Sequence, residues 1–259
     1  MSDYPIIQPM IAGVFPDFEV SLMLYQRRQG EKGEFPCLMF AIETGRGKKI
    51  IVDTGPCGFG EPSAKYHMPV RRTPDMEPRA ALQRIGITPE EVEMVILTHL
   101  HWDHTSNCKM YKNATFFVQK SELQFAIAPN PVQNSQYETG IRGHMPPWMA
   151  VYSQIEAVEG DVHDLVKGIH LIALPGHTPG SMGVAVETKK GVHLIAGDFI
   201  PLLANWEGDS KLRHIPGSIH INLDDYQRSF LKTEQIADVI LASHDFATAR
   251  HECYPVLGI

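Results

Sequence analysis

The sequence has little of what marks a secreted, disulfide-bonded or membrane-spanning protein. Its four cysteines (Cys37, Cys57, Cys108 and Cys253) are scattered and form no CxxC pair, so free thiols are the simplest interpretation. No stretch approaches the roughly 20 apolar residues that a transmembrane helix needs. The first eight residues lack the basic stretch and apolar run of a secretory signal. We therefore expect a cytoplasmic protein with no membrane partner.

Positive charge is also scarce. The chain has 23 Lys and Arg against 30 Asp and Glu, which gives a formal net charge of −7. The densest basic cluster is only Arg71-Arg72, and Lys189-Lys190 precedes a glycine as in a turn. Because an acidic surface repels phosphate backbones, nucleic acid is a disfavoured partner.

Linkers, charge blocks, low-complexity tracts and short repeats are missing as well. The chain has 259 residues, of which 43% are hydrophobic and 20% are charged. That composition is typical of a folded protein rather than a disordered chain, and many folds of about 250 residues form one unit. We therefore predict one domain over residues 1–259.

Short apolar runs between turns predict most of the regular structure. The predicted strands cover residues 19–25, 37–43, 49–53, 94–97, 115–119, 168–174, 181–187, 192–196 and 239–242. The predicted helices cover residues 77–85, 120–128 and 223–233. No regular element is predicted in the Pro-rich residues 129–150, and such loops often bind ligands. Strands precede and follow helices in both halves, which favours an α/β protein with two sheets between helices over one doubly wound sheet.

The strongest chemical signal is the segment His99-Leu100-His101-Trp102-Asp103-His104, which follows an apolar run. Three histidines and one aspartate in six residues are hard to explain as packing. His99 and His101 are two residues apart at a strand end, so their side chains can lean the same way. Asp103 and His104 are adjacent and must diverge. One pair can therefore bind one metal ion while the next pair binds a second, since imidazole and carboxylate are ordinary zinc ligands.

Three more candidate ligands, His177, Asp198 and His244, each follow a predicted strand. Each alone would more often be a turn or strand-end residue, but ligands at several strand ends can converge on one edge of a sandwich. A carboxylate such as Asp198 can bridge two ions, and a water between them becomes a nucleophile near neutral pH. Among the remaining histidines, only His144 and His220 are in polar loops that suit a substrate contact.

These motifs resemble those of the metallo-β-lactamase superfamily. Residues 98–104 resemble its HxHxDH signature, and the family's other motifs follow in the expected order at residues 52–55, 175–181, 197–198 and 243–245. The resemblance implies a four-layered αβ/βα sandwich with the metal site at one edge of the sheets.

The resemblance also implies a role for each candidate ligand. It implies that one metal is held by His99, His101 and His177, and that the other is held by Asp103, His104 and His244. Asp198 would bridge the two ions, and Asp53 would orient a ligand by hydrogen bonding.

Within the superfamily, the chain is most similar to the quorum-quenching N-acyl-homoserine lactonase group. Its size, the aromatic Trp102 inside the motif and the final residues 243–245 agree with that group. The commonest zinc β-lactamases have a cysteine in place of Asp198 and no histidine at the position of His104. One feature departs from the lactonases, which often have a tyrosine where this chain has Pro201. Another group would then have to polarise the substrate carbonyl.

The sequence therefore predicts a dinuclear-metal hydrolase of lactones or esters. Two divalent ions are expected, with zinc favoured and manganese or iron as alternatives. In the predicted mechanism a metal-bound hydroxide attacks the carbonyl and Asp103 donates a proton to the leaving group. Trp102, Phe199 and His220 are the expected substrate contacts, with residues 129–150 lining the pocket.

Other functions for the same ligand set stay open at this point. A phosphodiesterase or a thioesterase could use the same metal centre, although a phosphodiesterase would need cationic side chains near the metals. A binding protein of this fold could keep the metals without catalysis. The resemblance also makes a homodimer possible.

Overall fold

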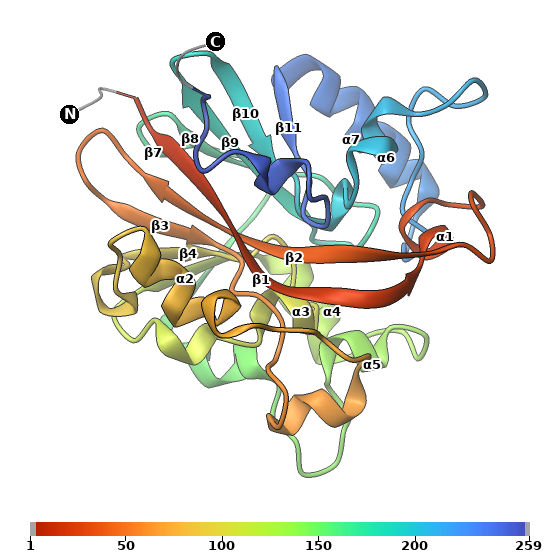
Figure 1. Ribbon diagram of the computed structural model, residues 1–259, viewed down its shortest axis with the longest axis horizontal. Helices are drawn as coiled ribbons and strands as arrows, with labels where there is room; N and C mark the ends of the chain where they lie inside the picture. The colour runs from red at the N-terminus through yellow and green to blue at the C-terminus, as the bar shows by residue number, and fades with distance from the viewer. Residues whose placement is uncertain (1–3, 257–259) are drawn as a thin grey trace.

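Two β-sheets packed face to face form the centre of the molecule (Figure 1). The computed structural model describes residues 4–256. The first sheet has the strand order β1-β2-β3-β4-β5-β6, and the second has the order β11-β10-β9-β8-β7. The strands of the first sheet are β1 (Ile6–Glu19), β2 (Lys32–Glu43), β3 (Lys49–Val52), β4 (Met94–Ile96), β5 (Thr115–Gln119) and β6 (Ile155–Val158). Those of the second are β7 (Val162–Val166), β8 (Ile169–Ala173), β9 (Met182–Thr188), β10 (Gly191–Ile195) and β11 (Val239–Leu241).

Helices cover the outer faces of both sheets (Figure 1). The α-helices are α1 (Val20–Met23), α2 (Pro78–Arg84), α3 (Trp102–Thr105), α4 (Lys120–Ile127), α5 (Asn134–Tyr137), α6 (Leu203–Glu207) and α7 (Leu223–Ile236). Helices α2 and α4 contribute to the core on the first sheet, and α7 contributes to the core on the second. No helix within residues 4–256 is long and apolar enough to cross a bilayer.

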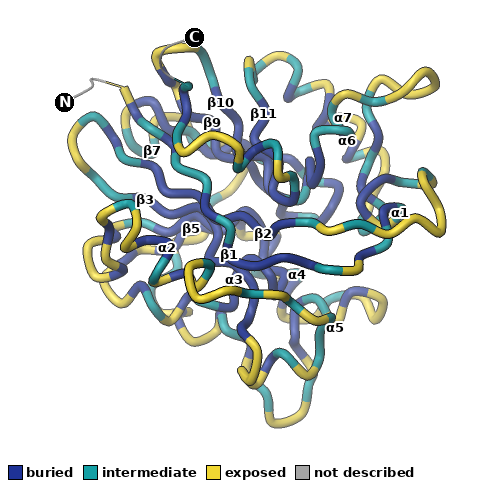
Figure 2. Tube along the Cα trace, viewed as in Figure 1, coloured by how far each residue is buried: buried dark blue, intermediate teal, exposed yellow. Residues whose placement is uncertain are grey.

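The layers follow from the alternation of side chains along the strands. On β2, Leu38, Phe40 and Ile42 belong to the core between the two sheets, whereas Met39 and Ala41 belong to the core under α2 and α4. Such an all-apolar strand is expected where both faces of a sheet are covered. Figure 2 shows the strands buried and the connecting loops exposed. The predicted αβ/βα sandwich is confirmed.

Both sheets are mixed, and their strand directions bring loops to one edge. Strands β3, β4, β5 and β6 pair in parallel, while β1, β2 and β3 pair antiparallel. In the second sheet β8 and β10 both pair antiparallel with β9, so they run in the same direction. Strand β11 pairs parallel with β10 and shares that direction. The carboxyl ends of parallel strands share an edge, so loops after β4, β8, β10 and β11 can meet.

The strand predicted over residues 19–25 is wrong. The structure places β1 before it, at Ile6–Glu19, and a single helical turn, α1, follows. Pro9 and Pro16 within β1 conceal the strand pattern in the sequence, because proline cannot donate a ladder hydrogen bond. They are tolerated because β1 is an edge strand of its sheet. The expectation of irregular structure over residues 129–150 holds except for the turn α5 and the start of a 3₁₀ segment at Pro147–Gln154.

Two adjacent residues of α7 test this layering directly. Phe230 is fully buried against the second sheet, whereas Leu231 is 49% exposed. Phe230→Ala should lower the free energy of unfolding by about 3–5 kcal/mol, because it leaves a cavity in a packed layer. Leu231→Ala should cost less than about 1 kcal/mol. Urea unfolding of both variants measures the difference, and equal losses would contradict the packing of α7.

Candidate metal centre

Three imidazole nitrogens from two loops point at one another at the edge of the sandwich. His177, after β8, places its Nε2 3.2 Å from His99 Nε2 and 3.1 Å from His101 Nδ1. All three side chains are buried. Nitrogens bound to one tetrahedral zinc ion at about 2.0–2.1 Å would lie about 3.3 Å apart. The spacing therefore fits one metal ion between the three rings.

A second group lies beside the first and contains Asp103, His104, Asp198 and His244. Asp198 Oδ1 lies 3.1 Å from His104 Nε2 and 3.0 Å from His244 Nε2. Asp103 Oδ2 lies 3.6 and 3.7 Å from the same two nitrogens. His104 Nε2 is buried and, although it is near Asp198 Oδ1, makes no well-aligned hydrogen bond with a described residue. Since buried polar atoms are rarely left without a partner, this nitrogen also fits a metal ligand.

Asp198 connects the two groups. Its Oδ1 faces His104 and His244, while its Oδ2 lies 3.6 Å from His177 Nε2 and 4.0 Å from His99 Nε2. Ser243 Oγ donates a 2.8 Å hydrogen bond to Oδ1 and fixes the carboxylate. One carboxylate oxygen for each group is the arrangement that a bridging ligand requires. The donor set of five imidazoles and two carboxylates therefore fits a pair of divalent ions.

Each imidazole uses its outer nitrogen for a hydrogen bond and turns the inner one toward the centre. The outer partners are Thr98 Oγ1 for His99, Gln133 Oε1 for His101, Asp53 Oδ2 for His104, the Ile219 carbonyl for His177 and the Pro36 carbonyl for His244, at 2.7–3.2 Å. These oxygens accept here, the Thr98 hydroxyl included because it donates its own hydrogen to Asp53, so each outer nitrogen carries a hydrogen. The neutral form of each ring then has its lone pair on the inner nitrogen. This tautomer is the one that binds metals.

Asp53 joins two strands of the first sheet to the centre. It follows β3 and accepts 2.8 Å hydrogen bonds from the Thr98 amide, from Thr98 Oγ1 and from His104 Nδ1. Its backbone has a φ of +58°, a conformation that non-glycine residues seldom adopt. These contacts suit the orienting role that the sequence predicts for Asp53.

Glu122, on α4, is a positioning residue that the sequence analysis did not single out. Its buried carboxylate accepts hydrogen bonds from the amides of Leu100 and Gly180 and from the hydroxyls of Tyr137 and Thr178, at 2.6–3.1 Å. Burial raises its pKa, and these hydrogen bonds offset the effect only in part. Gly180 approaches so closely that a Cβ would lie 2.3 Å from the Glu122 amide. Glu122 thus holds the loop of His99 and His101 against the loop of His177.

The two groups differ in charge. Burial, with a contribution from neighbouring imidazoles, holds the pKa of His99 and His101 well below the usual value, so both rings are neutral. Burial also opposes protonation of His104 and His244, but Asp198 and Asp103 outweigh it and raise the pKa of both. Burial alone would raise the pKa of Asp198, yet His244 and His104 hold it well below the usual range. The second group therefore holds protons that a metal ion would displace.

A hollow of about 270 Å³ opens onto both groups. Apolar side chains form much of its wall, and the described residues that line it include no Lys or Arg. The lining residues that are not candidate ligands are Phe15, Phe18, Leu22, Met23, Tyr66, His67, Met68, Trp102, Ser135, Gln136 and Ile219. Ser135 and Gln136 come from the loop at residues 129–150 that the sequence predicts in the pocket.

The three predicted substrate contacts have different locations. Trp102 lines the hollow. Phe199 is buried in the core on the second sheet, with ring centroids 5.3 Å from Tyr226 and 4.8 Å from Phe230, and it does not line the hollow. That prediction fails because the turn after Asp198 directs Phe199 toward α7.

His220 does not line the hollow either. Its Nδ1 contacts the Gly217 carbonyl at 2.9 Å and its ring packs on Tyr25, while its neighbour Ile219 lines the hollow instead. His144 is bonded to Glu138 and also lies outside the lining. Pro201 contributes only backbone here, since its carbonyl accepts a 2.8 Å hydrogen bond from the His244 amide.

Known proteins are similar to this chain in sequence and in fold. The family model of the metallo-beta-lactamase superfamily matches residues 33–244. The N-acyl homoserine lactonase AttM of Azorhizobium caulinodans is 27% identical over 236 residues, which cover 83% of this chain and 84% of that protein. An N-acyl homoserine lactonase of a Bacillus species is 27% identical over 169 residues, and the match spans 62% of each chain.

Solved structures agree with the fold. A quorum-quenching N-acyl homoserine lactone lactonase superimposes with a TM-score of 0.74 and 20% identity, covering 96% of this chain and 95% of the other. AidC, a dizinc quorum-quenching lactonase, superimposes with a TM-score of 0.70 and 17% identity, covering 95% of this chain and 89% of the other. At these identities the likeness concerns the arrangement of the sheets and helices.

The difference in charge predicts which group loses its metal first in acid. Metal binding to the second group must displace protons from His104 and His244, whereas His99 and His101 are already neutral. His101→Ala leaves the second group intact, and Asp103→Ala leaves the first. As the pH falls from about 8 to about 5, His101→Ala should release zinc at a higher pH than Asp103→Ala. Metal analysis after dialysis measures this, and the reverse order would contradict the assignment.

Glu122→Gln should weaken both stability and metal binding. A glutamine side chain has one acceptor oxygen and brings its own N–H groups, so it cannot satisfy the four donors around Glu122. We expect a loss of about 2 kcal/mol or more in the free energy of unfolding and a lower zinc content. Glu159→Gln is the matched control, because the Glu159 carboxylate is exposed and contacts Lys120 in an ion pair. Normal zinc content in Glu122→Gln would rule out its positioning role.

Proposed function

We propose that this chain, which belongs to the metallo-beta-lactamase superfamily, is a metal-dependent hydrolase that opens the carbonyl–oxygen bond of a lactone or ester. The observation that carries the proposal is the pair of ligand groups joined by Asp198 at the base of a largely apolar hollow. The names of the curated relatives, which are N-acyl homoserine lactonases, support the same class of substrate.

The lining of the hollow favours an uncharged substrate over a phosphodiester. Phosphoryl transfer develops negative charge on the phosphate oxygens, and Lys or Arg side chains commonly help metal ions to stabilise it. The described lining residues supply no Lys or Arg, and they include the aromatic side chains of Phe15, Phe18 and Trp102. A neutral ester or lactone with an apolar substituent fits that surface better.

When bound, two divalent ions would lower the pKa of a water molecule and polarise the substrate carbonyl. Seven side chains of this chain would hold them, with His99, His101 and His177 in one set and Asp103, His104 and His244 in the other, joined by Asp198. Nitrogen and oxygen donors without a thiolate suit zinc, and they also suit manganese or iron.

Asp103 is the residue best placed to move a proton. Its carboxylate lines the hollow and makes no hydrogen bond with a described residue, so it can turn one oxygen toward the substrate. There it can take the proton that the attacking water loses and pass it to the departing alkoxide oxygen as the ring or ester opens. We assign Asp103 this role of proton donor to the leaving group.

A substrate panel tests the proposed function. Zinc-, manganese- and iron-loaded protein is assayed against N-acyl homoserine lactones, simple lactones, aryl esters, thioesters and bis-p-nitrophenyl phosphate. We expect turnover of lactones or esters to exceed that of the phosphodiester by at least about a hundredfold, because the hollow lacks cationic groups. Preferred hydrolysis of the phosphodiester or of the thioesters would contradict the assignment of the substrate class.

His101→Ala tests the link between metal and activity. This change removes one of three nitrogens from the first group, so we expect lower zinc content and loss of kcat by about a thousandfold or more. His163→Ala, at an exposed histidine on β7, is the matched control and should behave as wild type. Wild-type turnover by metal-free His101→Ala protein would contradict the proposed mechanism.

A further inference from the structure

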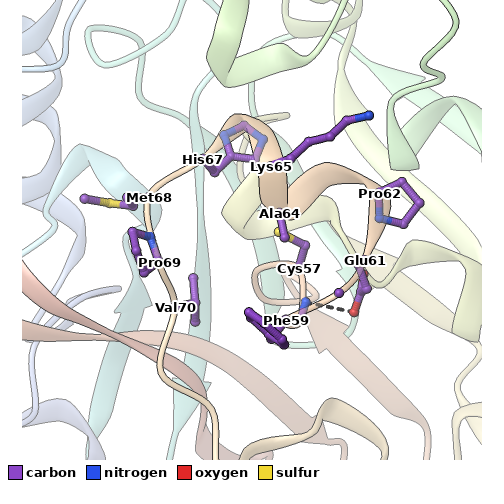
Figure 3. Close-up of a pocket in the computed structure, with 12 residues that line it drawn as sticks. Cys57, Phe59, Glu61, Pro62, Ala64, Lys65, His67, Met68, Pro69 and Val70 are labelled. Carbon is purple, nitrogen blue, oxygen red and sulfur yellow. Dashed lines mark hydrogen bonds between the residues drawn. The ribbon is translucent and has the colours of Figure 1, made fainter.

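His67, which the sequence analysis did not single out, is a fixed part of the pocket wall. Its ring lies flat on Trp102, with centroids 4.0 Å apart and an interplanar angle of 5°. Its Nε2 lies 2.7 Å from Glu138 Oε1. Figure 3 shows His67 between Lys65 and Met68 on the loop that forms a neighbouring hollow, and His67 and Met68 line both that hollow and the one above the candidate ligands.

The partner of His67 is a buried carboxylate. Glu138 is only 1% exposed, and its second oxygen lies 3.0 Å from His144 Nε2. Burial alone would raise the pKa of Glu138, but hydrogen bonds from His67 and His144 outweigh it and hold the pKa below its usual value. The ionised carboxylate only accepts hydrogen bonds, so Nε2 of His67 donates to it. The ring is thereby fixed in orientation, with Nδ1 on its other side.

Nδ1 of His67 makes no hydrogen bond with any of residues 4–256. The side chain is only 3% exposed but lines the hollow, and Nδ1 is not among the fully enclosed polar atoms that lack a partner. Apart from the candidate ligands, His67 and Trp102, the polar side chains that line the hollow are those of Tyr66, Ser135 and Gln136. None of the three is fixed by a side-chain hydrogen bond to a described residue. His67 is therefore the polar group that is already oriented before a ligand arrives, which favours specific binding.

We propose that His67 is a substrate-contacting residue, whose Nδ1 forms a hydrogen bond with a polar group of the lactone or ester beside the bond that is cleaved. Glu138 is the positioning residue that orients the ring. This inference rests on the proposed function, because it assigns a contact to the substrate of the same centre. It also gives the pocket a polar contact outside the metal ligands, on the wall formed by Trp102.

Two substitutions of His67 by an amide residue test the roles of Nδ1 and Nε2 separately. His67→Gln can keep a donor that reaches Glu138 but places no polar atom where Nδ1 stands. His67→Asn places an amide atom near the position of Nδ1 but is too short to reach Glu138. We expect His67→Gln to lose at least about tenfold in kcat/KM on the best substrate of the panel, the effect of one hydrogen bond in the transition state. His67→Asn should retain more of kcat/KM while its melting temperature falls further.

The zinc content of both variants should match that of the wild type, because His67 belongs to neither ligand group. His163→Gln serves as the exposed control. Wild-type kcat/KM in His67→Gln would overturn the inference, and so would His67→Asn being impaired as strongly as His67→Gln. Wild-type protein that hydrolyses no lactone or ester would overturn the proposed function and this inference with it. An active wild type with an unaffected His67→Gln variant would overturn this inference alone.

A second readout needs no substitution in the protein that is measured. In nitrogen NMR of histidine-labelled, zinc-loaded wild-type protein, the Nδ1 signal of His67 should move when the hydrolysis product is added, while its Nε2 signal should move less. The spectrum of His67→Asn assigns the two signals by their absence. A product that shifts only the signals of the ligand histidines would overturn the contact, even if the His67→Gln variant failed to fold.

Discussion

Burial of five imidazoles and two carboxylates at one edge of the sandwich is the constraint on which the other features of the site depend. Polar groups out of water are costly unless they are hydrogen-bonded or bound to a metal. Here the outer nitrogen of every candidate imidazole ligand has an acceptor, and the inner nitrogens face one another or Asp198. The outer nitrogen of each ring is hydrogen-bonded within the protein, and the inner nitrogen is placed to bind a cation.

The fold meets this constraint with contacts between loops that are far apart in sequence. Asp53 joins the end of β3 to Thr98 and His104, and Glu122 joins the loop after β4 to the loop after β8. Both carboxylates accept several hydrogen bonds from backbone amides and hydroxyls, so both fix the positions of the loops that they contact. Without these two carboxylates, the ligands would depend on short irregular loops for their positions, and a displacement of about 1 Å is enough to impair a metal site.

The sequence predicted the elements whose signals are local. His99, His101, Asp103 and His104 lie within six residues after an apolar strand, and the sandwich followed from the order of strands and helices. The strand β1 was missed because Pro9 and Pro16 interrupt its pattern, although an edge strand tolerates both.

The residues that support the site were not predictable in the same way. Glu122 looks like any glutamate on a helix, and the pairing of His67 with Glu138 joins residues 71 positions apart. Phe199 was predicted as a substrate contact, yet the direction of its side chain depends on how the turn after Asp198 packs against α7. Sequence spacing identifies candidate ligands, whereas the residues that position those ligands and line the pocket depend on tertiary contacts between distant segments.

The central claim is that one carboxylate joins two metal sites at the base of the hollow. A crystal structure of zinc-loaded protein, with anomalous scattering recorded at the zinc edge, tests it most directly. Our account predicts two anomalous peaks about 3.5–4 Å apart. One peak should lie among His99, His101 and His177 and the other among Asp103, His104 and His244, with Asp198 bound to both. A single peak, or zinc bound away from Asp198, would contradict it.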